Sequence, residues 1–181
     1  MRQLFFIAII PPHELAEKVT AIKSRFADRF ASSKALRLMP HITLKPPFEL
    51  SGSQADAIID WFENVNLGIS PFEISLDGFG AFERKHPVIF IKPDFSEELN
   101  LLRQNLIKQL SRDFVKAANR EDDYFHPHVT VAYRDLTAQN FAKAWPEYRS
   151  GAFRGSFTVG NLHLLRHDGV KWIVAATNNL K

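Results

Sequence analysis

Pro40-His41-Ile42-Thr43-Leu44 is the stretch on which the interpretation of the whole chain depends. Alternate residues of a β-strand point to opposite faces, so a strand here would carry His41 and Thr43 on the same face. Ile42 and Leu44 would then point into a hydrophobic core. The stretch therefore predicts a rigid strand that offers one imidazole and one hydroxyl to a common site.

The same pattern returns later in the chain as Pro127-His128-Val129-Thr130-Val131. One His-x-Thr triplet is a weak signal, because such triplets occur by chance in many proteins. Two copies, each with proline before the histidine and aliphatic residues around the threonine, are much harder to attribute to chance. His128 and Thr130 thus form a second candidate pair. The structural alternative is two ordinary strands with half-buried histidines.

The composition is that of a globular protein of one domain or two small lobes, with 181 residues of which 45% are hydrophobic and 16 are Phe. Cysteine is absent, which excludes disulfides, thiolate nucleophiles and cysteine-based zinc sites. This fits a reducing compartment, and we expect a cytoplasmic protein. The net charge of +3 permits an anionic ligand but is far from the dense basic surface of a duplex-binding protein.

The N-terminal run 4–10 is apolar, but it is short and Pro11-Pro12 follows it, so we interpret it as a central, doubly buried strand. No other run is long enough to cross a bilayer, and no membrane association is expected. An amphipathic helix follows over residues 15–30, with Lys18, Lys23, Arg25 and Arg29 available to its solvent face.

Further helices are predicted after Ser51 or Ser53, after Ser96, and around 141–145, with the serines as N-caps. Strands are predicted at 72–76 and 87–91, and the second motif strand at about 125–133. The prolines of Lys45-Pro46-Pro47-Phe48 are expected to end the first motif strand. The C-terminal part reads as a hairpin of strands 153–166 and 170–177.

Each motif strand follows a long amphipathic helix and precedes another helix, which suggests an internal duplication. No linker or low-complexity segment separates the halves. We therefore expect residues 1–181 to form a single domain of two α+β lobes that share one cleft.

The paired motifs resemble those of the two-histidine (2H) phosphoesterase superfamily, which includes the bacterial 2'-5' RNA ligase-like proteins and cyclic nucleotide phosphodiesterases. The stretch 40–48, with its Pro-His-Ile-Thr-Leu-Lys and Pro-Phe, looks closest to the YjcG-like bacterial phosphoesterases. The resemblance covers nearly the whole chain. It implies a LigT-like fold, with two antiparallel sheets that line a central cleft, helices outside and a pseudo-twofold axis. It also implies a site without metal or other cofactor that acts on 2',3'-cyclic phosphates or related phosphodiesters.

The chain departs from the ligase-like pattern at Ala132-Tyr133-Arg134, where those members often have an Ala-Arg pair. In a continuing strand the extra residue would turn Arg134 to the other face, which disfavours it as a phosphate ligand and disfavours RNA ligation. Further candidates for substrate binding fall into three kinds. They are the cations Lys45 and Arg84, the stacking rings Phe48 and Phe82, and Tyr124 at the edge of the cleft.

Opening a cyclic phosphate requires a base that activates water and an acid that protonates the leaving oxygen, on opposite sides of phosphorus. Two imidazoles that face one another suit both tasks. We assign His128 as base and His41 as acid for hydrolysis, roles that exchange in the reverse reaction. The hydroxyls of Thr43 and Thr130 would contact the non-bridging oxygens. The expected partner is a nucleotide or short RNA with a cyclic phosphate or a 2'-5' linkage, and no obligate protein partner is evident.

Two other classes of function remain open. One is a metal hydrolase, in which His126 and His128 are ligands on one strand face, His41 is a third, and Asp122 and Asp123 lie nearby in sequence. The other is a module that binds RNA or nucleotides without catalysis, which needs the cleft but neither an acid nor a base.

Overall fold

The computed structural model describes residues 2–117 and 124–181, and it contains two four-stranded antiparallel sheets. The strand order is β2-β1-β7-β8 in the first sheet and β5-β4-β3-β6 in the second. This is the α+β, LigT-like architecture that the resemblance implied. The strands are β1 (Arg2–Ile9), β2 (Ile42–Ser51), β3 (Phe72–Phe82), β4 (Val88–Pro93), β5 (Val129–Ala132), β6 (Arg154–Val159), β7 (Asn161–His167) and β8 (Trp172–Asn179).

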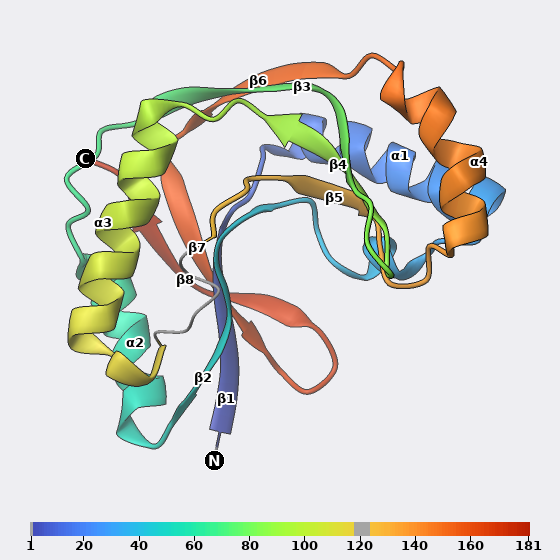
Figure 1. Ribbon diagram of the computed structural model, residues 1–181. Coiled ribbons are helices and arrows are strands. Elements are labelled where there is room, and N and C mark those ends of the chain that lie inside the picture. Colours follow the sequence, from blue (N-terminus) through green and yellow to red (C-terminus); the bar gives the residue numbers. More distant parts are fainter. Residues whose placement is uncertain (1, 118–123) are drawn as a thin grey trace.

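Among the described residues, four α-helices lie outside the sheets (Figure 1): α1 (His13–Phe30), α2 (Ser53–Asn64), α3 (Glu97–Asp113) and α4 (Ala138–Arg149). Two short 3-10 turns, η1 (Lys34–Arg37) and η2 (Val115–Ala117), follow α1 and α3. Ser96 caps α3 as predicted, because its hydroxyl accepts a hydrogen bond from the Leu99 amide at 3.2 Å. The predicted serine cap of α2 is wrong, since Gly52 is the residue at that position and no side chain caps the helix.

Helices α1 and α3 each pack on the sheet to which their flanking strands do not belong (Figure 1). Helix α1 connects β1 and β2 of the first sheet but packs on β5 of the second, and α3 connects β4 and β5 but packs on β2. Both motif strands, β2 and β5, are edge strands of their sheets. The predicted pseudo-twofold relation is therefore present, and it makes β2 and β5 equivalent edge strands of the two sheets.

Strand β1 is central in its sheet and buried on both faces, as the apolar N-terminal run predicted. Phe5, Ile7 and Ile9 belong to the main hydrophobic core, which includes residues of both sheets. Phe6 and Ala8 point to the other face, where Leu165 completes a second small cluster. This second face is the one on which the candidate site is built.

The predicted end of the first motif strand is wrong, because β2 continues through Pro46 and Pro47 to Ser51. An edge strand tolerates proline, since one side of its backbone needs no ladder hydrogen bonds. The register between β1 and β2 also shifts twice, between Phe5 and Ile7 and between Ile7 and Ala8. These irregularities take up the proline pair within the strand.

The prediction of one strand over 153–166 is also wrong. This stretch forms two strands, β6 and β7, which belong to different sheets. Strand β6 pairs with β3, and after Gly160 the chain enters β7, which pairs with β1. A continuous apolar pattern cannot reveal such a change of sheet. The hairpin of β7 and β8 is confirmed, although its second strand begins at Trp172. The second motif strand is shorter than predicted and begins at Val129.

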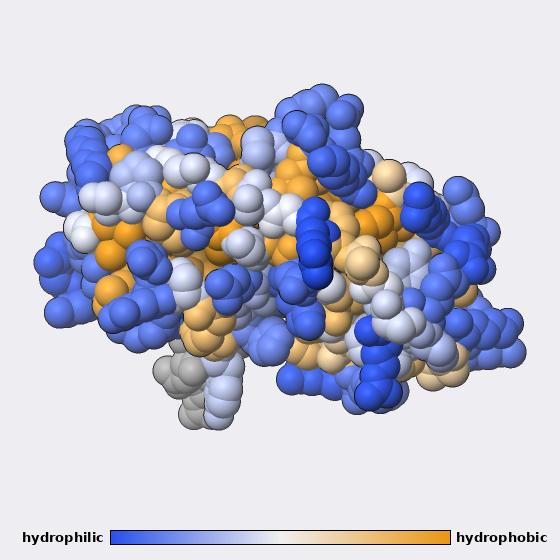
Figure 2. All heavy atoms as spheres, turned by 90° about the horizontal axis from the view of Figure 1, so that it is seen from above, coloured by the Kyte–Doolittle hydropathy of each residue, from blue (hydrophilic) through white to orange (hydrophobic). Residues whose placement is uncertain are grey.

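Hydrophilic residues cover both ends of the face seen from above, and apolar residues are visible between them (Figure 2). Among residues 2–117 and 124–181, no helix is long and apolar enough to cross a membrane.

Candidate active site

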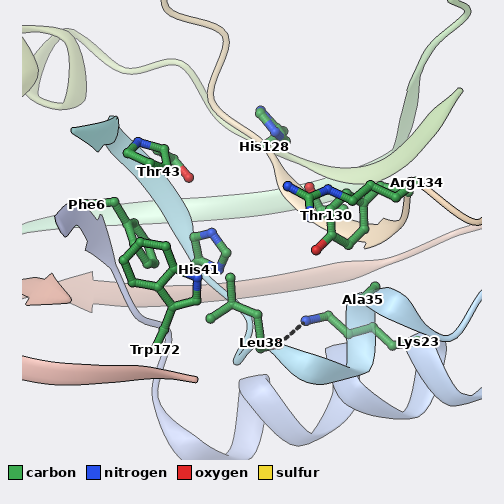
Figure 3. Close-up of a pocket in the computed structure, with 12 residues that line it drawn as sticks. Phe6, Lys23, Ala35, Leu38, His41, Thr43, His128, Thr130, Arg134 and Trp172 are labelled. Atoms are coloured by element: carbon green, nitrogen blue, oxygen red, sulfur yellow. Dashed lines mark hydrogen bonds between the residues drawn. The ribbon is translucent and has the colours of Figure 1, made fainter. Parts of the chain in front are cut away.

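Both predicted pairs line one pocket, which has a volume of about 310 Å³. His41 and Thr43 enter it from the start of β2, and His128 and Thr130 from the start of β5 (Figure 3). Each histidine directly precedes its strand. The remaining lining residues are Phe6, Lys23, Ala35, Leu38, Pro47, Tyr133, Arg134 and Trp172. The volume is at the lower end of the range that is usual for small-molecule sites.

The two imidazoles are oriented by equivalent hydrogen bonds to the backbone. Nδ1 of His41 lies 2.8 Å from the Met39 carbonyl oxygen, and Nδ1 of His128 lies 2.7 Å from that of His126. A carbonyl oxygen can only accept, so Nδ1 carries the proton in both rings. In the neutral imidazole, Nε2 is then the free acceptor. Both rings therefore present the same nitrogen for proton transfer.

The environment favours the neutral form of both imidazoles. Burial lowers the pKa of His41 to about 4, the hydrogen bond to Met39 opposes this, and repulsion from Lys23 and His128 adds to the lowering. The pKa of His128 is also lowered, mainly by burial. Both rings line the same pocket, and repulsion from His128 is the smallest of the causes that act on His41. His41 could act as the acid only after the negative charge of a bound phosphate had raised its pKa.

Aromatic side chains support each imidazole from behind. The Phe6 ring lies 5.2 Å from that of His41 and makes an edge contact with Trp172 at 4.6 Å, both distances between ring centroids. On the other side, Phe82 and Phe90 lie 5.3 and 5.4 Å from the His128 ring. These contacts limit rotation of the imidazoles and exclude water from their rear faces.

Lys23 lies in the pocket wall, although the sequence placed it on the solvent face of α1. Its side chain is only 3% exposed, and Nζ donates to the Leu38 carbonyl oxygen at 2.8 Å. The sequence contains a weak signal for this burial. Lys23 follows Val19 by four positions and precedes Phe26 by three, so it borders the apolar stripe of the helix. Burial lowers its pKa to about 8.

Arg134 also lines the pocket, because β5 ends at Ala132 and the backbone turns sharply after it. The Arg134 φ angle of 57° is in the left-handed region, and the Asp135 amide donates to the Tyr133 carbonyl oxygen. The expectation that an extra residue would turn this side chain away assumed a continuing strand. Such strained backbone in a non-glycine residue is often found at functional sites.

Asp135 fixes this turn to the segment that follows α1. Its carboxylate accepts hydrogen bonds from the Ser32 hydroxyl at 2.9 Å and from the amides of Ser33 and Lys34 at 2.8 and 2.9 Å. Desolvation alone would raise the pKa of Asp135, but these donors outweigh it and lower the pKa. The carboxylate thereby joins two walls of the pocket.

Two predicted substrate contacts, Lys45 and Phe48, are corrected by the structure. Ala8 pairs with Thr43 and Ile7 pairs with Lys45, so the irregularity between them places Lys45 on the core side with Ile7. Lys45 is completely buried above the Phe48 ring, which stacks on Phe5. Neither side chain lines the pocket.

The other candidates lie around the pocket rather than in its wall. Phe82 supports His128, and the Arg84 guanidinium lies 5.6 Å above the Phe82 ring at the surface. Tyr124 is 87% exposed and does not line the pocket. A part for these three in substrate binding remains a prediction.

Within the part of the chain that the structure describes, no three histidine, aspartate or glutamate side chains are grouped to hold a metal ion. Asp122 and Asp123, the carboxylates of the metal hypothesis, lie outside the described residues. None of the described residues that line the pocket is acidic.

The model of the 2'-5' RNA ligase superfamily matches residues 11–171, which include both motifs. The chain belongs to this superfamily. The chain is similar to a protein of Bacillus cytotoxicus, with 27% identity over 176 residues, 96% of this chain and 95% of the relative. A protein of Staphylococcus haemolyticus is 28% identical, with 96% and 97% covered. Both bear the name "Putative phosphoesterase".

Solved structures share the fold of this chain. TT0787 of Thermus thermophilus superposes with a TM-score of 0.74 at 20% identity, over 99% of this chain and 98% of that one. LigT of Escherichia coli in its apo form gives 0.70 at 21% identity, with the same coverage. LigT has also been crystallised with 3'-AMP, and that structure gives a TM-score of 0.71 at 20% identity, over 100% of this chain and 99% of LigT.

Proposed function

We propose that the protein is a metal-independent phosphoesterase that opens 2',3'-cyclic phosphates or related nucleotide phosphodiesters. One observation carries the proposal: two imidazoles and two threonine hydroxyls, from equivalent edges of two sheets, line one pocket whose described wall contains no carboxylate. The pocket thus has the groups for acid–base chemistry at an anion. Its described lining residues do not include the paired carboxylates of many other hydrolases.

In the proposed reaction, one histidine Nε2 takes a proton from water as the water oxygen attacks phosphorus. The bond from phosphorus to one ribose oxygen breaks, and the other histidine gives its proton to that oxygen. The product is a phosphomonoester with a free hydroxyl on the neighbouring ribose carbon. The Thr43 and Thr130 hydroxyls donate to the non-bridging oxygens, where negative charge increases in the transition state.

The comparisons support the chemical class of the substrate. Relatives that span nearly the whole chain carry a phosphoesterase name, and LigT binds 3'-AMP, a nucleotide with a phosphate on a ribose hydroxyl. A mononucleotide or the end of a short RNA suits a small, partly apolar pocket with Phe6 and Trp172 in its wall.

The decisive assay measures turnover of a panel of 2',3'-cyclic nucleotides, ADP-ribose cyclic phosphate and short 2'-5'-linked RNAs. His41→Ala and His128→Ala should each lower kcat by about 10²–10⁴-fold, since acid and base act in the same step. His163→Ala is a matched control, because this partly buried histidine contacts Thr177 and does not line the pocket. Wild-type turnover in either motif variant would remove that histidine from the mechanism.

The same assay separates the two alternatives. The proposed mechanism gives a bell-shaped pH dependence that survives EDTA, because one neutral and one protonated imidazole are needed together. Loss of activity on chelation would favour the metal hydrolase. Nucleotide binding that persists in both alanine variants, without turnover of any phosphodiester, would favour the non-catalytic module.

A further inference from the structure

Lys23 is a buried cation that the proposed two-histidine mechanism does not use. It reaches the pocket from α1, whereas both motifs reach it from the strand edges. In Figure 3 its amine points toward the side of the pocket where Leu38 and His41 lie. The burial of this cation in the pocket wall needs a physical explanation.

Among the described residues, one hydrogen-bond partner of the Lys23 amine is found. An ammonium group has three donors, and the carbonyl oxygen of Leu38 accepts one. Among the described residues, no carboxylate forms an ion pair with this amine, and burial is the sole cause of its lowered pKa. A buried charge without a counter-ion is costly, so a purely structural role does not explain a lysine at this position.

The pocket that Lys23 faces is deficient in negative charge. Arg134 lines the same pocket, the described lining residues include no acid, and the titratable groups among them include the imidazoles of His41 and His128. Lys23 and His41 line the same pocket, and repulsion from Lys23 contributes to the low pKa of His41. An anion between them would satisfy both the free donors and the charge.

We propose that Lys23 is an anion-binding residue, whose ammonium contacts a non-bridging oxygen of the substrate phosphate on the side of the pocket formed by α1. This rests on the proposed function for the identity of the substrate, but not for the presence of the anion site. The contact neutralises charge on the phosphate as water attacks. It also raises the pKa of His41 by bringing a negative charge next to both groups.

The test is binding of inorganic phosphate to the purified protein at pH 7, measured by calorimetry. Lys23→Met keeps the length and apolar stem of the side chain and removes the charge. It should weaken phosphate binding by roughly tenfold to hundredfold, the usual loss for one charge-assisted hydrogen bond. Lys18→Met is the matched control, because Lys18 is on the same helix, exposed, and paired with Glu14. This control should bind as the wild type does.

A second measurement observes the lysine in the wild-type protein and uses a substitution only to assign its signal. In the wild-type protein with isotope-labelled lysine, added phosphate should raise the pKa of one lysine, identified by its absence in Lys23→Arg. Equal phosphate affinity in wild type and Lys23→Met, or no response of that lysine, would overturn the proposal. Charge-dependent phosphate binding without turnover of any cyclic phosphate would leave the anion site intact and reject the phosphoesterase function instead.

Discussion

His41 and His128 are held in the same manner, each with Nδ1 hydrogen-bonded to the carbonyl oxygen of the residue two positions earlier. A bond of this kind fixes the ring plane and the tautomer together, so Nε2 is available at both sides of the pocket. The motif therefore includes the backbone before the histidine, where a proline separates the carbonyl from the imidazole. Pro40 and Pro127 restrict the conformation of this link.

Acidification of the free protein should protonate His128 before His41. Both pKa values are lowered by burial, but His41, with a pKa of about 4, is also repelled by Lys23. Imidazole proton resonances followed by NMR from pH 8 to 3.5 would give the order, with His41→Gln to assign the signals. Protonation of His41 first would contradict the described electrostatics.

The low pKa of His41 has a consequence for stability. The unfolded chain takes up a proton near pH 6.5 and the folded protein only near pH 4, so the free energy of unfolding decreases as the pH falls through this window. The decrease due to His41 alone should be about 3 kcal/mol. Urea unfolding of wild type and His41→Gln at pH 7 and 4.5 measures it, because the variant should lose much less stability than the wild type.

The threonine hydroxyls should matter more than the threonine shape. Thr43→Ser should keep most of the activity and Thr43→Val should lose about 100-fold or more, with the same contrast at Thr130, because valine has nearly the same shape but no donor. Steady-state kinetics of the four variants on one cyclic nucleotide would show it. If serine and valine variants behave alike, the threonines act only as β-formers.

Gly80→Ala should reduce activity through the support of His128. A Cβ atom at this position would lie 2.5 Å from the Phe90 ring, whose other contacts include the imidazole of His128. The ring must shift, and we expect kcat/KM to fall about tenfold, with a loss of about 1–3 kcal/mol in stability. Gly160→Ala is the control, because a Cβ atom there meets no other atom within 4 Å. Unchanged kinetics in Gly80→Ala would show that this packing does not position the imidazole.

Asp135→Asn should loosen both walls of the pocket that the carboxylate joins. The amide offers one acceptor oxygen where the carboxylate has two, so it cannot accept both from the amides of Ser33 and Lys34 and from the Ser32 hydroxyl as the carboxylate does. We expect a loss of about 1–2 kcal/mol in stability and a larger KM than kcat effect, since Arg134 is displaced. Asp77→Asn is the comparison, since Asp77 is exposed and 3.9 Å from Arg154. Equal KM values in wild type and Asp135→Asn would argue against this role.

Lys23→Met should make the protein more stable at neutral pH. The lysine pKa is about 8 in the folded protein and near 10.5 when unfolded, so the wild type gains stability as the pH rises through this window. The variant should be about 2–3 kcal/mol more stable at pH 7, and the difference should shrink toward pH 10.5. Urea unfolding at pH 7 and 10 would reveal it. A less stable variant at pH 7 would mean that the lysine contributes to the fold.

The site histidines and threonines could be predicted from the sequence because strand alternation is local, and each motif carries its whole pattern in five residues. Lys23 could not, because a lysine at the border of an apolar stripe is normally solvent-exposed, and its burial depends on α1 packing against the opposite sheet. Lys45 was misplaced for a related reason. One irregularity in the pairing of β1 with β2 places the Lys45 side chain on the opposite face of the sheet. The local sequence pattern does not predict this pairing.

The change of sheet at Gly160 and the turn at Arg134 were missed on similar grounds. Both depend on which strand the following segment meets, which only the assembled sheets determine. By contrast, the long helices and the central position of β1 followed directly from the periodicity of their apolar residues. The order of the elements could thus be predicted from the sequence. The direction of a side chain that follows a strand irregularity could not.

The crossing of α1 and α3 to opposite sheets bears on the ancestry of the chain. A fragment that ended after β3 would contain α1 without the sheet on which α1 packs, and β3 without its partners β4 and β6. Such a half-length polypeptide could cover its apolar surfaces by assembling with a second copy that exchanged the same helix, in the manner of a domain-swapped dimer. In such an assembly each copy would bring one histidine to a common pocket, so the pair of imidazoles would require two chains.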